Sequence, residues 1–274
     1  YTAGLWDRIA PQDEYKSPID KDLVARGFQG EHVTGGYNIS FRYPQEGLGE
    51  MFRRLSAMCD VQYGRTVTRI DIRAKEIRFS NGEVSAYERI ISTLPLVAMT
   101  ALTGVETESK PDPYTSVLVL NIGGKRGSRC PEEHWLYVPY SKSGFYRVGL
   151  YSNVDVNFLP KSLRNKNGVS FYVEKAYRAD EKPSPDEIET LCRQIIAELI
   201  SWKFLATADV VDPTWIDVAY TWSYPGSTWK EEMIQALQDH SIIQVGRYAR
   251  WHSRGIVDSV REGLEAGASM RKPD

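Results

Sequence analysis

The spacing of apolar and polar residues divides the chain into a strand-rich middle and several helices. Between Thr66 and Thr93 the two kinds alternate, and Asn81-Gly82 is a dipeptide typical of a two-residue hairpin turn. This pattern predicts a meander of small strands that leads to a short buried strand, RIISTLP. Aromatic and β-branched residues predict one antiparallel sheet from four further stretches, SVLVLNIGG, HWLYVPY, FYRVGLYSN and GVSFYVEKAY.

Helices are expected where apolar residues recur every three or four positions. In SPDEIETLCRQIIAELISW, Ser184 and Glu187 form a capping box and Pro185 occupies the first helical position. A second helix is expected from Glu50 to Met58. The other predicted elements are a strand, two helices, an extended stretch and a final helix: WIDVAYTWSYP, SPIDKDLVARGF, TWKEEMIQALQ, Phe41 to Tyr43 and the helix near the C-terminus. The chain is therefore predicted to be α+β, with an antiparallel or mixed sheet and flanking helices.

The segment VGRYARWHSRGIVDSVREGLEAG, residues 245–267, combines a strand end, a glycine and a helix. Gly246 permits a close approach of the backbone. Asp258 and Ser259 are expected at the N-terminus of the helix, where unpaired backbone N–H groups attract anions. The residues alone leave two interpretations open, an anion-binding site and a plain strand-to-helix turn with Asp258 as the N-cap.

The stretch HWLYVPYSKSGFYRVGLYSN places aromatic side chains and an arginine on two adjacent predicted strands. Alternation puts Tyr137 with Trp135 on one face, and Arg147 with Phe145 on one face of the next strand. Tyrosine hydroxyls and a guanidinium suit a diphosphate. The alternative is a sheet core from which the arginine reaches toward solvent.

Composition narrows the function classes. With 274 residues, 26% of them charged, and a formal net charge of −2, the chain is not expected to bind nucleic acid through its overall charge. Cys59, Cys130 and Cys192 are far apart and form no CxxC pair, and only four histidines are present, which argues against a metal site. No apolar run has the length of a membrane span, so a cytoplasmic protein is expected.

Sequence motifs for nucleotide binding are missing from the chain. Neither GxGxxG nor GxxxxGK[ST] occurs, and EGLGEM, which contains Gly47, lacks the third glycine of the first motif. A GxSxG nucleophile elbow is absent as well. Considered by itself, Gly47 is therefore interpreted as part of a turn that precedes a helix.

Several stretches in combination resemble a known superfamily. YPQEGLGEMFRRL, VTRIDIRAKEIRFSNGEVSAYERIISTLPL and the segment 245–267 resemble flavin-dependent amine oxidases and protoporphyrinogen oxidases. HWLYVPYSKSGFYRVGLYSN, SYPGST and YTAGLW are similar to stretches of the UDP-galactopyranose mutase branch. The resemblance covers almost the whole chain and implies four parts. These are a helical or linker segment beside the substrate site (1–64), the meander and strand of an incomplete Rossmann-like FAD domain (65–95), a substrate domain built on the sheet (96–235) and the C-terminal strand and helix of the FAD domain (236–274).

The resemblance also implies roles for individual residues. Arg147 and Tyr137 would bind the diphosphate of a UDP-sugar, joined by Tyr224, with Trp6 near the uridine. No catalytic side chain is implied, because N5 of the flavin would act and the protein would position the substrate. NAD(P)H would be a possible reductant of the flavin. The residues expected along the FAD are Gly47, Gly246, Arg247, Asp258 and Ser259.

The chain also departs from the mutase pattern. Thr2 stands where that pattern has Asn, Ser253 stands where it has Tyr, and a second phosphate-binding arginine corresponds to Lys21 or Arg26 without a clear alignment. A GxGxxG strand is expected before Tyr1 or on another chain, so that this chain alone would bind FAD poorly. Two further hypotheses are an oxidoreductase of the amine oxidase or protoporphyrinogen oxidase type, and a binding module without catalysis.

Overall fold

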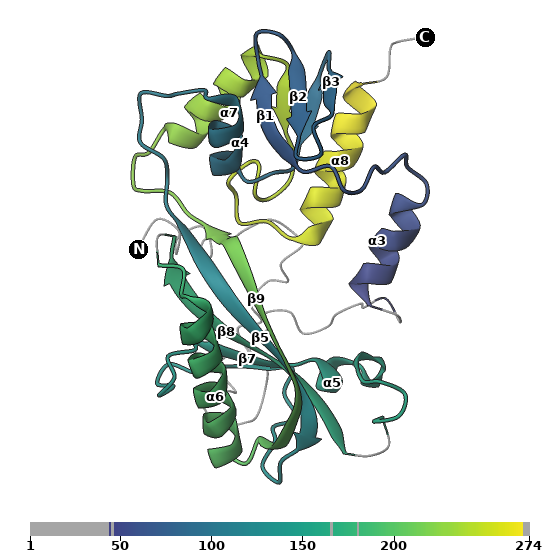
Figure 1. Ribbon diagram of the computed structural model, residues 1–274, viewed down its shortest axis with the longest axis vertical. Helices are drawn as coiled ribbons and strands as arrows, with labels where there is room; N and C mark the ends of the chain where they lie inside the picture. Colours follow the sequence, from purple (N-terminus) through teal and green to yellow (C-terminus); the bar gives the residue numbers. More distant parts are fainter. Residues whose placement is uncertain (1–43, 45–46, 165–166, 180, 271–274) are drawn as a thin grey trace, which may run out of the picture. The chain divides into compact units, whose positions relative to one another are not determined.

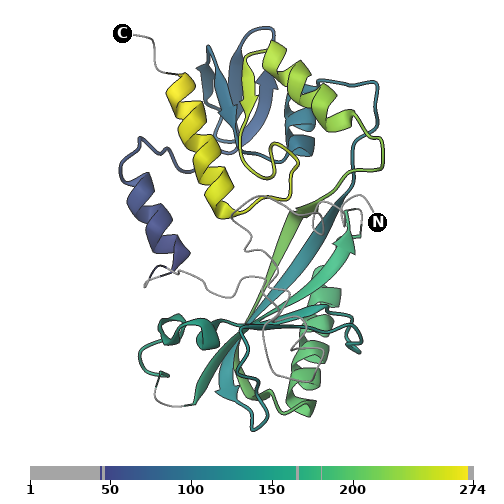
Figure 2. The same cartoon turned by 180° about the vertical axis from the view of Figure 1, so that it is seen from behind.

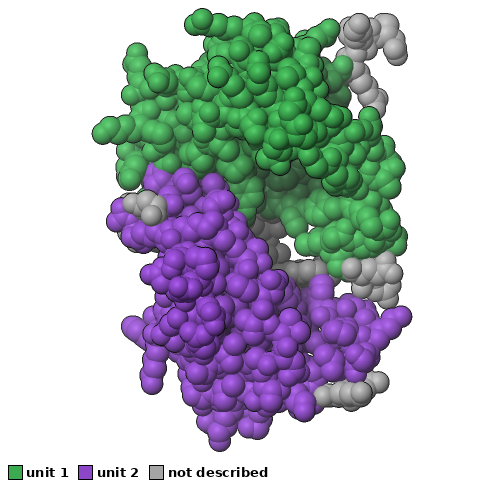
Figure 3. Space-filling view, viewed as in Figure 1, with its two compact units in different colours: residues 1–112, 222–274 green, residues 113–221 purple. Residues whose placement is uncertain are grey.

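The computed structural model describes residues 44, 47–164, 167–179 and 181–270. The predicted helix SPIDKDLVARGF and the extended stretch at Phe41 to Tyr43 lie outside these residues. The chain forms two compact units, which Figure 3 distinguishes by colour. Unit 1 comprises Tyr1–Asp112 and Trp222–Asp274, and unit 2 comprises Pro113–Thr221.

Unit 2 is built on a five-stranded antiparallel sheet, with the strand order β6-β7-β8-β5-β9 (Figure 1). The sequence prediction of one antiparallel sheet from these stretches is therefore confirmed. The long strand β5 pairs with β8 and β9, which both come later in the chain, whereas β6 and β7 are short and neighbour each other directly. The strand bounds are β5 (Tyr114–Arg126), β6 (Trp135–Tyr137), β7 (Arg147–Leu150), β8 (Gly168–Arg178) and β9 (Leu205–Thr221).

One face of this sheet forms the hydrophobic core with helix α6 (Pro185–Ser201), which lies along it in Figures 1 and 2. Alternate residues of each strand point to opposite faces, so Leu120 of β5 and Val173 of β8 are both buried in this core. The helix contributes Leu191, Ile195 and Leu199. The opposite face carries the intervening, more polar residues.

The N-terminus of α6 has the capping box that its sequence predicts. The backbone N–H of Glu187 donates to Ser184 Oγ at 3.4 Å, and the backbone N–H of Ser184 donates to Glu187 Oε2 at 2.8 Å. Pro185 takes the first helical position, where no N–H is needed. This local signal fixes where the helix begins.

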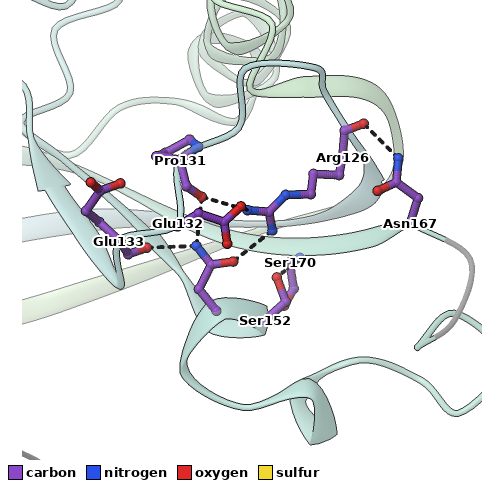
Figure 4. Close-up of polar contacts among 8 residues, drawn as sticks. Arg126, Pro131, Glu132, Glu133, Ser152, Asn167 and Ser170 are labelled. Carbon is purple, nitrogen blue, oxygen red and sulfur yellow. Dashed lines mark hydrogen bonds and ion pairs between the residues drawn. The ribbon is translucent and has the colours of Figure 1, made fainter.

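The segment after β7 is anchored by Arg126 at the end of β5. Its Nη1 donates to Asn153 Oδ1 at 2.8 Å and its Nη2 donates to the carbonyl oxygen of Pro131 at 2.8 Å (Figure 4). Nη2 also forms an ion pair with Glu132 at 2.9 Å. The contact with Asn153 ties the short helical turn α5 (Tyr151–Val154) to the end of β5, and a second turn, η1 (Val156–Phe158), follows it.

Unit 1 contains the predicted meander and a parallel pair of short strands. In the antiparallel sheet β1-β2-β3, Gly82 lies in the hairpin turn with φ 88°. Strand β4 pairs in parallel with β10, and Ile91 of β4 is 44% exposed, so the prediction that this strand is buried is wrong for that side chain. The bounds are β1 (Val67–Asp71), β2 (Glu76–Phe79), β3 (Val84–Ala86), β4 (Ile90–Ser92) and β10 (Ile242–Gln244).

Four helices accompany these strands within the described part of unit 1. The predicted helix at 50–58 is present but begins two residues earlier, because Gly47, with φ 86°, is its N-cap. Helix α7 contacts β10 and α4, so both helices belong to unit 1, whereas the sequence prediction groups residues 96–235 together. The bounds are α3 (Leu48–Ser56), α4 (Leu96–Thr103), α7 (Trp229–Asp239) and α8 (Ile256–Ser269). The α+β fold with antiparallel sheets and flanking helices is confirmed.

Candidate ligand-binding site

Arg147 and Tyr137 lie opposite each other on the two strands at one edge of the unit 2 sheet. Strands β6 and β7 pair in a register that places Tyr137 across from Arg147. The side chain of Tyr137 is 66% exposed, and that of Arg147 is 23% exposed. The structure therefore brings together two residues that the sequence assigns to one site, with the tyrosine on the solvent side.

The prediction that Phe145 and Arg147 share one face of their strand is wrong. Phe145 is buried in the core together with Val148, whereas Arg147 reaches the polar face of the sheet. Phe145 precedes the first residue of β7, so the strict alternation of a strand does not extend to it. The alternative interpretation, in which Phe145 is a core residue, is confirmed.

Glu174 on β8 is the principal partner of Arg147. The two residues are paired in the register of β7 and β8, and Arg147 Nη2 donates to Glu174 Oε1 at 2.5 Å. The hydroxyl of Tyr146 donates to Glu174 Oε2. Tyr220 on β9 donates to the same oxygen at 3.2 Å, and its hydroxyl accepts from Arg147 Nη2 at 3.0 Å. One carboxylate thus collects three donors from two segments of the chain.

This network changes the protonation properties of its members. Burial raises the pKa of the Tyr146 hydroxyl well above its ordinary value, and the hydrogen bonds with Glu174 and Tyr220 add to that effect. Burial acts to lower the pKa of the Arg147 guanidinium, but the hydrogen bond and charge of Glu174 outweigh it and raise the pKa. Arg147 is therefore cationic and Tyr146 is a neutral donor under all ordinary conditions.

The rest of the guanidinium is surrounded by aromatic rings. Its central carbon lies 5.8 Å from the ring centroid of Tyr146 and 5.8 Å from that of Tyr172. The ring of Tyr172 crosses Gly149, where a Cβ atom would lie 1.8 Å from the ring. Among the described residues, no partner accepts a hydrogen bond from the buried Arg147 Nε. This edge of the cation is therefore the one that an added acceptor could use.

Sequence reasoning did not identify Glu174 or Tyr220 as part of the site. They are 27 and 73 residues from Arg147 in the sequence, and only the pairing of β7, β8, β5 and β9 brings them together. The one local signal is that Glu174 is an acidic residue inside a strand of aromatic and β-branched residues, FYVEKAY. A carboxylate at such a position normally has a partner.

In unit 1, the Gly246 segment is shaped by acidic side chains. Gly246 has φ 91°, and its backbone N–H donates to Glu262 Oε2 at 2.7 Å. Glu262 also forms an ion pair with Arg254 at 2.7 Å. No described atom lies within 4 Å of the position that a Cβ atom of Gly246 would take. Gly246 therefore has open space on the side of a Cβ atom, whereas its own N–H is already bound to Glu262.

The start of α8 differs from the prediction. The N-cap is Gly255, so Asp258 is the third helical residue and not the N-cap. The backbone N–H of Gly255 donates to Asp258 Oδ2 at 3.0 Å, and the hydroxyl of Ser259 donates to the carbonyl oxygen of Gly255 at 3.3 Å. A buried carboxylate in the first turn occupies the place where a helix would attract an anion. This carboxylate would compete with an added anion for the end of the helix, and the cofactor role of Asp258 and Ser259 stays a prediction.

The remaining predicted site residues are distributed as follows. Tyr224 is in unit 1, where its backbone N–H donates to Asp112 Oδ1 at 3.2 Å and its ring packs edge-on against Trp222. Its part in a site with Arg147 stays a prediction. The guanidinium of Arg247 lies over the ring of Tyr248 at 5.5 Å. Trp6, Thr2, Lys21 and Arg26 lie outside the described residues.

Neither a metal site nor a membrane-spanning helix is present in the part of the chain that the structure describes. No group of three or more His, Cys, Asp or Glu side chains there could hold a metal ion. No described helix combines the length and the apolar character that crossing a membrane requires.

Comparisons with known proteins agree with the fold. A family model described as flavin containing amine oxidoreductase matches residues 16–270. The crystal structure of reduced UDP-galactopyranose mutase matches with a TM-score of 0.71 and 25% sequence identity. The match covers 93% of this chain and 57% of that one. The CLA-producing fatty acid isomerase from P. acnes is 10% identical with a TM-score of 0.54, over 93% and 57% of the two chains. A search of curated proteins found no match.

The family match extends over most of the sequence, including the meander, the sheet of unit 2 and α8. The chain belongs to the flavin containing amine oxidoreductase family. Within that family it is similar to UDP-galactopyranose mutase, and the resemblance inferred from the sequence is confirmed. The chain spans a little over half the length of the two solved structures.

Proposed function

We propose that the protein is a FAD-dependent enzyme that acts on a UDP-sugar, in the manner of a mutase. The observation that carries this proposal is the Arg147 guanidinium on the polar face of the sheet, with an unpartnered Nε and the exposed Tyr137 opposite. The similarity to UDP-galactopyranose mutase supports a nucleotide-sugar as the ligand. Arg147 would donate to the diphosphate, and Tyr137 would supply a hydroxyl and a ring at the rim.

Bound FAD would supply the nucleophilic and redox chemistry. In unit 1, the open side of Gly246 would accept a flat part of the cofactor. The bound N–H of Gly246 and the carboxylate of Asp258 would disfavour the phosphates at these two positions. The proposal therefore gives the segment 245–267 contact with the ring system and leaves the diphosphate of FAD to other residues.

The substitution of Arg147 by methionine tests the proposal, because methionine keeps the apolar stem and removes the charge. We expect the Kd of UDP, measured by isothermal titration calorimetry, to rise about tenfold to hundredfold, the effect of losing hydrogen bonds from a charged donor. Arg126→Met is the matched control, because the Arg126 side chain has a similar exposure of 20% but donates to Asn153 and Pro131, away from the Arg147 network. Equal UDP affinity in Arg147→Met and wild type would contradict the proposal.

An amine or apolar substrate is the second candidate, and one specific observation favours it. The Arg147–Glu174 pair carries no net charge, so the site does not require an anionic ligand. The family match is to flavin containing amine oxidoreductases. Hydrogen peroxide formation from an amine, in a flavin-loaded protein that does not bind UDP, would support this candidate over the first. A protein that binds neither flavin nor UDP would contradict both.

A further inference from the structure

We propose that Glu174 is a positioning residue, which fixes the plane of the Arg147 guanidinium for an anionic ligand. This inference rests on the proposed function, because it concerns the same ligand site. It assigns no chemical step to Glu174, since the carboxylate contacts Arg147 and two tyrosines rather than the ligand.

The first argument is the arrangement of the donors around Glu174. The carboxylate is buried, and it accepts from Arg147 Nη2 at 2.5 Å, from Tyr220 at 3.2 Å and from Tyr146. The hydroxyls of Tyr146 and Tyr220 also lie 3.1 Å apart. Each contact limits the others, because three donors converge on one rigid carboxylate. The position of the carboxylate is itself set by the β7–β8 register, which pairs Glu174 with Arg147.

The second argument is the planarity of the guanidinium. Its nitrogen atoms form a rigid fork, so holding one nitrogen in place orients the others. Nη2 is held twice, by Glu174 and by Tyr220 at 3.0 Å. The Nε atom is left without a partner among the described residues. Glu174 therefore fixes the direction of the Nε edge of the guanidinium and keeps the Arg147 side chain in one rotamer.

Two opposing effects decide the sign of the expected result. The Glu174 carboxylate repels a nearby anion, which weakens binding. It also removes, before binding, the rotamer freedom that a long arginine side chain would otherwise lose on binding. Because the carboxylate contacts Nη2 and leaves the buried Nε without a partner among the described residues, we expect orientation to outweigh repulsion. Removal of Glu174 is then expected to weaken binding.

The test uses UDP as the probe and two substitutions of different chemistry. Glu174→Leu removes the acceptor, and we expect the Kd of UDP to rise tenfold or more. Glu174→Gln keeps one oxygen that can accept from Arg147 Nη2, and we expect it to restore the Kd to within threefold of wild type. A near-normal Kd in Glu174→Gln would show that the site needs the acceptor oxygen of residue 174 and not its negative charge. Tighter or unchanged binding in Glu174→Leu would overturn the inference.

A double-mutant cycle separates positioning from general damage to the fold. In an Arg147→Met background, Glu174→Leu should change the Kd less than twofold, because nothing remains to be positioned. An equal loss in both backgrounds would show a structural role instead. Glu198→Gln is the matched control, since Glu198 is also buried in unit 2 but holds the backbone N–H groups of Lys142 and Ser143. Its Kd should stay within twofold of wild type.

The outcomes distinguish this inference from the proposed function. If Arg147→Met leaves UDP binding unchanged, both fail. If Arg147→Met weakens binding and Glu174→Leu does not, the inference alone fails. Should Glu174→Leu not fold, as judged by circular dichroism, Tyr220→Phe removes the second contact of Nη2, and we expect about a threefold rise in the Kd. The inference would be overturned if the Kd of UDP were unchanged in Tyr220→Phe and rose more than tenfold in Glu174→Gln.

Discussion

Carboxylates hold both Arg147 in unit 2 and Gly246 in unit 1, but they bind different groups. Glu174 accepts from side chains, and part of the Arg147 cation remains for another acceptor. Glu262 accepts from the backbone N–H of Gly246, which is thereby fully used. A carboxylate on a guanidinium can thus prepare an anion site, whereas a carboxylate on a backbone N–H removes one. The contrast favours an anion in unit 2 and a neutral ring beside Gly246.

A second contrast concerns glycines, and it predicts the largest effect. In unit 2, a Cβ atom on Gly124 of β5 would lie 1.9 Å from the backbone oxygen of Thr207. Neither backbone can retreat without breaking the β5–β9 pairing, so we expect Gly124→Ala to lower the free energy of unfolding by roughly 3 kcal/mol. Urea denaturation followed by circular dichroism would measure it. The neighbour Gly123 is the control, because its Cβ atom would lie 3.6 Å from Val210 Cβ, an ordinary contact.

The two substitutions can also contradict this explanation. Gly123→Ala is expected to change the free energy of unfolding by less than about 1 kcal/mol. Similar values for the two variants would mean that crowding by β9 does not decide the position of the strand. The β5 strand also pairs with β8, which carries Glu174, so Gly124→Ala should weaken UDP binding as well.

At Gly246 in unit 1, glycine is required because of the backbone angle φ and not because neighbouring atoms are crowded. Gly246 has φ 91°, and open space surrounds its Cα on the side of a Cβ atom. We expect Gly246→Ala to lower the free energy of unfolding by about 1 to 2 kcal/mol, because an L-residue strains at that angle. Thermal or chemical denaturation of the purified protein would measure this change.

A glycine of the same unit supplies a control of opposite sign. Gly263 lies inside α8, without a positive φ and with no described atom within 4 Å of a Cβ atom. Gly263→Ala should therefore raise the free energy of unfolding by up to about 1 kcal/mol. If both alanine variants changed stability in the same direction, the angle at Gly246 would not be the cause.

The accuracy of the sequence predictions follows the range of the interactions involved. The capping box of α6 and the hairpin at Gly82 depend on neighbouring residues, and both were predicted. The network of Arg147 depends on Glu174 and Tyr220, whose positions follow from the order of strands in the sheet. No local pattern encodes that order. The predicted start of α8 was wrong, because an aspartate such as Asp258 can act either as the N-cap or as the third residue of a helix.

The smallest expected effect concerns a carboxylate in unit 2 that holds backbone N–H groups, as Glu262 does in unit 1. Glu198 accepts from the backbone N–H of Lys142 and of Ser143, each at 2.8 Å, and from the hydroxyl of Ser141 at 3.2 Å. Burial acts to raise the pKa of Glu198, but these hydrogen bonds outweigh it and lower the pKa below its ordinary value of 4.5. The charged form is therefore the one that stabilises the fold.

This direction fixes how stability should depend on pH. Because the folded pKa of Glu198 is lowered, its contribution is complete above the unfolded pKa and is lost as the pH falls through the folded pKa. We expect Glu198→Gln to cost about 1 kcal/mol of unfolding free energy at pH 7, and the difference from wild type to shrink steadily below about pH 4.5. Urea denaturation at a series of pH values would measure the difference. A difference that grows on acidification would mean that protonated Glu198 is the stabilising form, and that the 141–143 turn is held by the neutral acid.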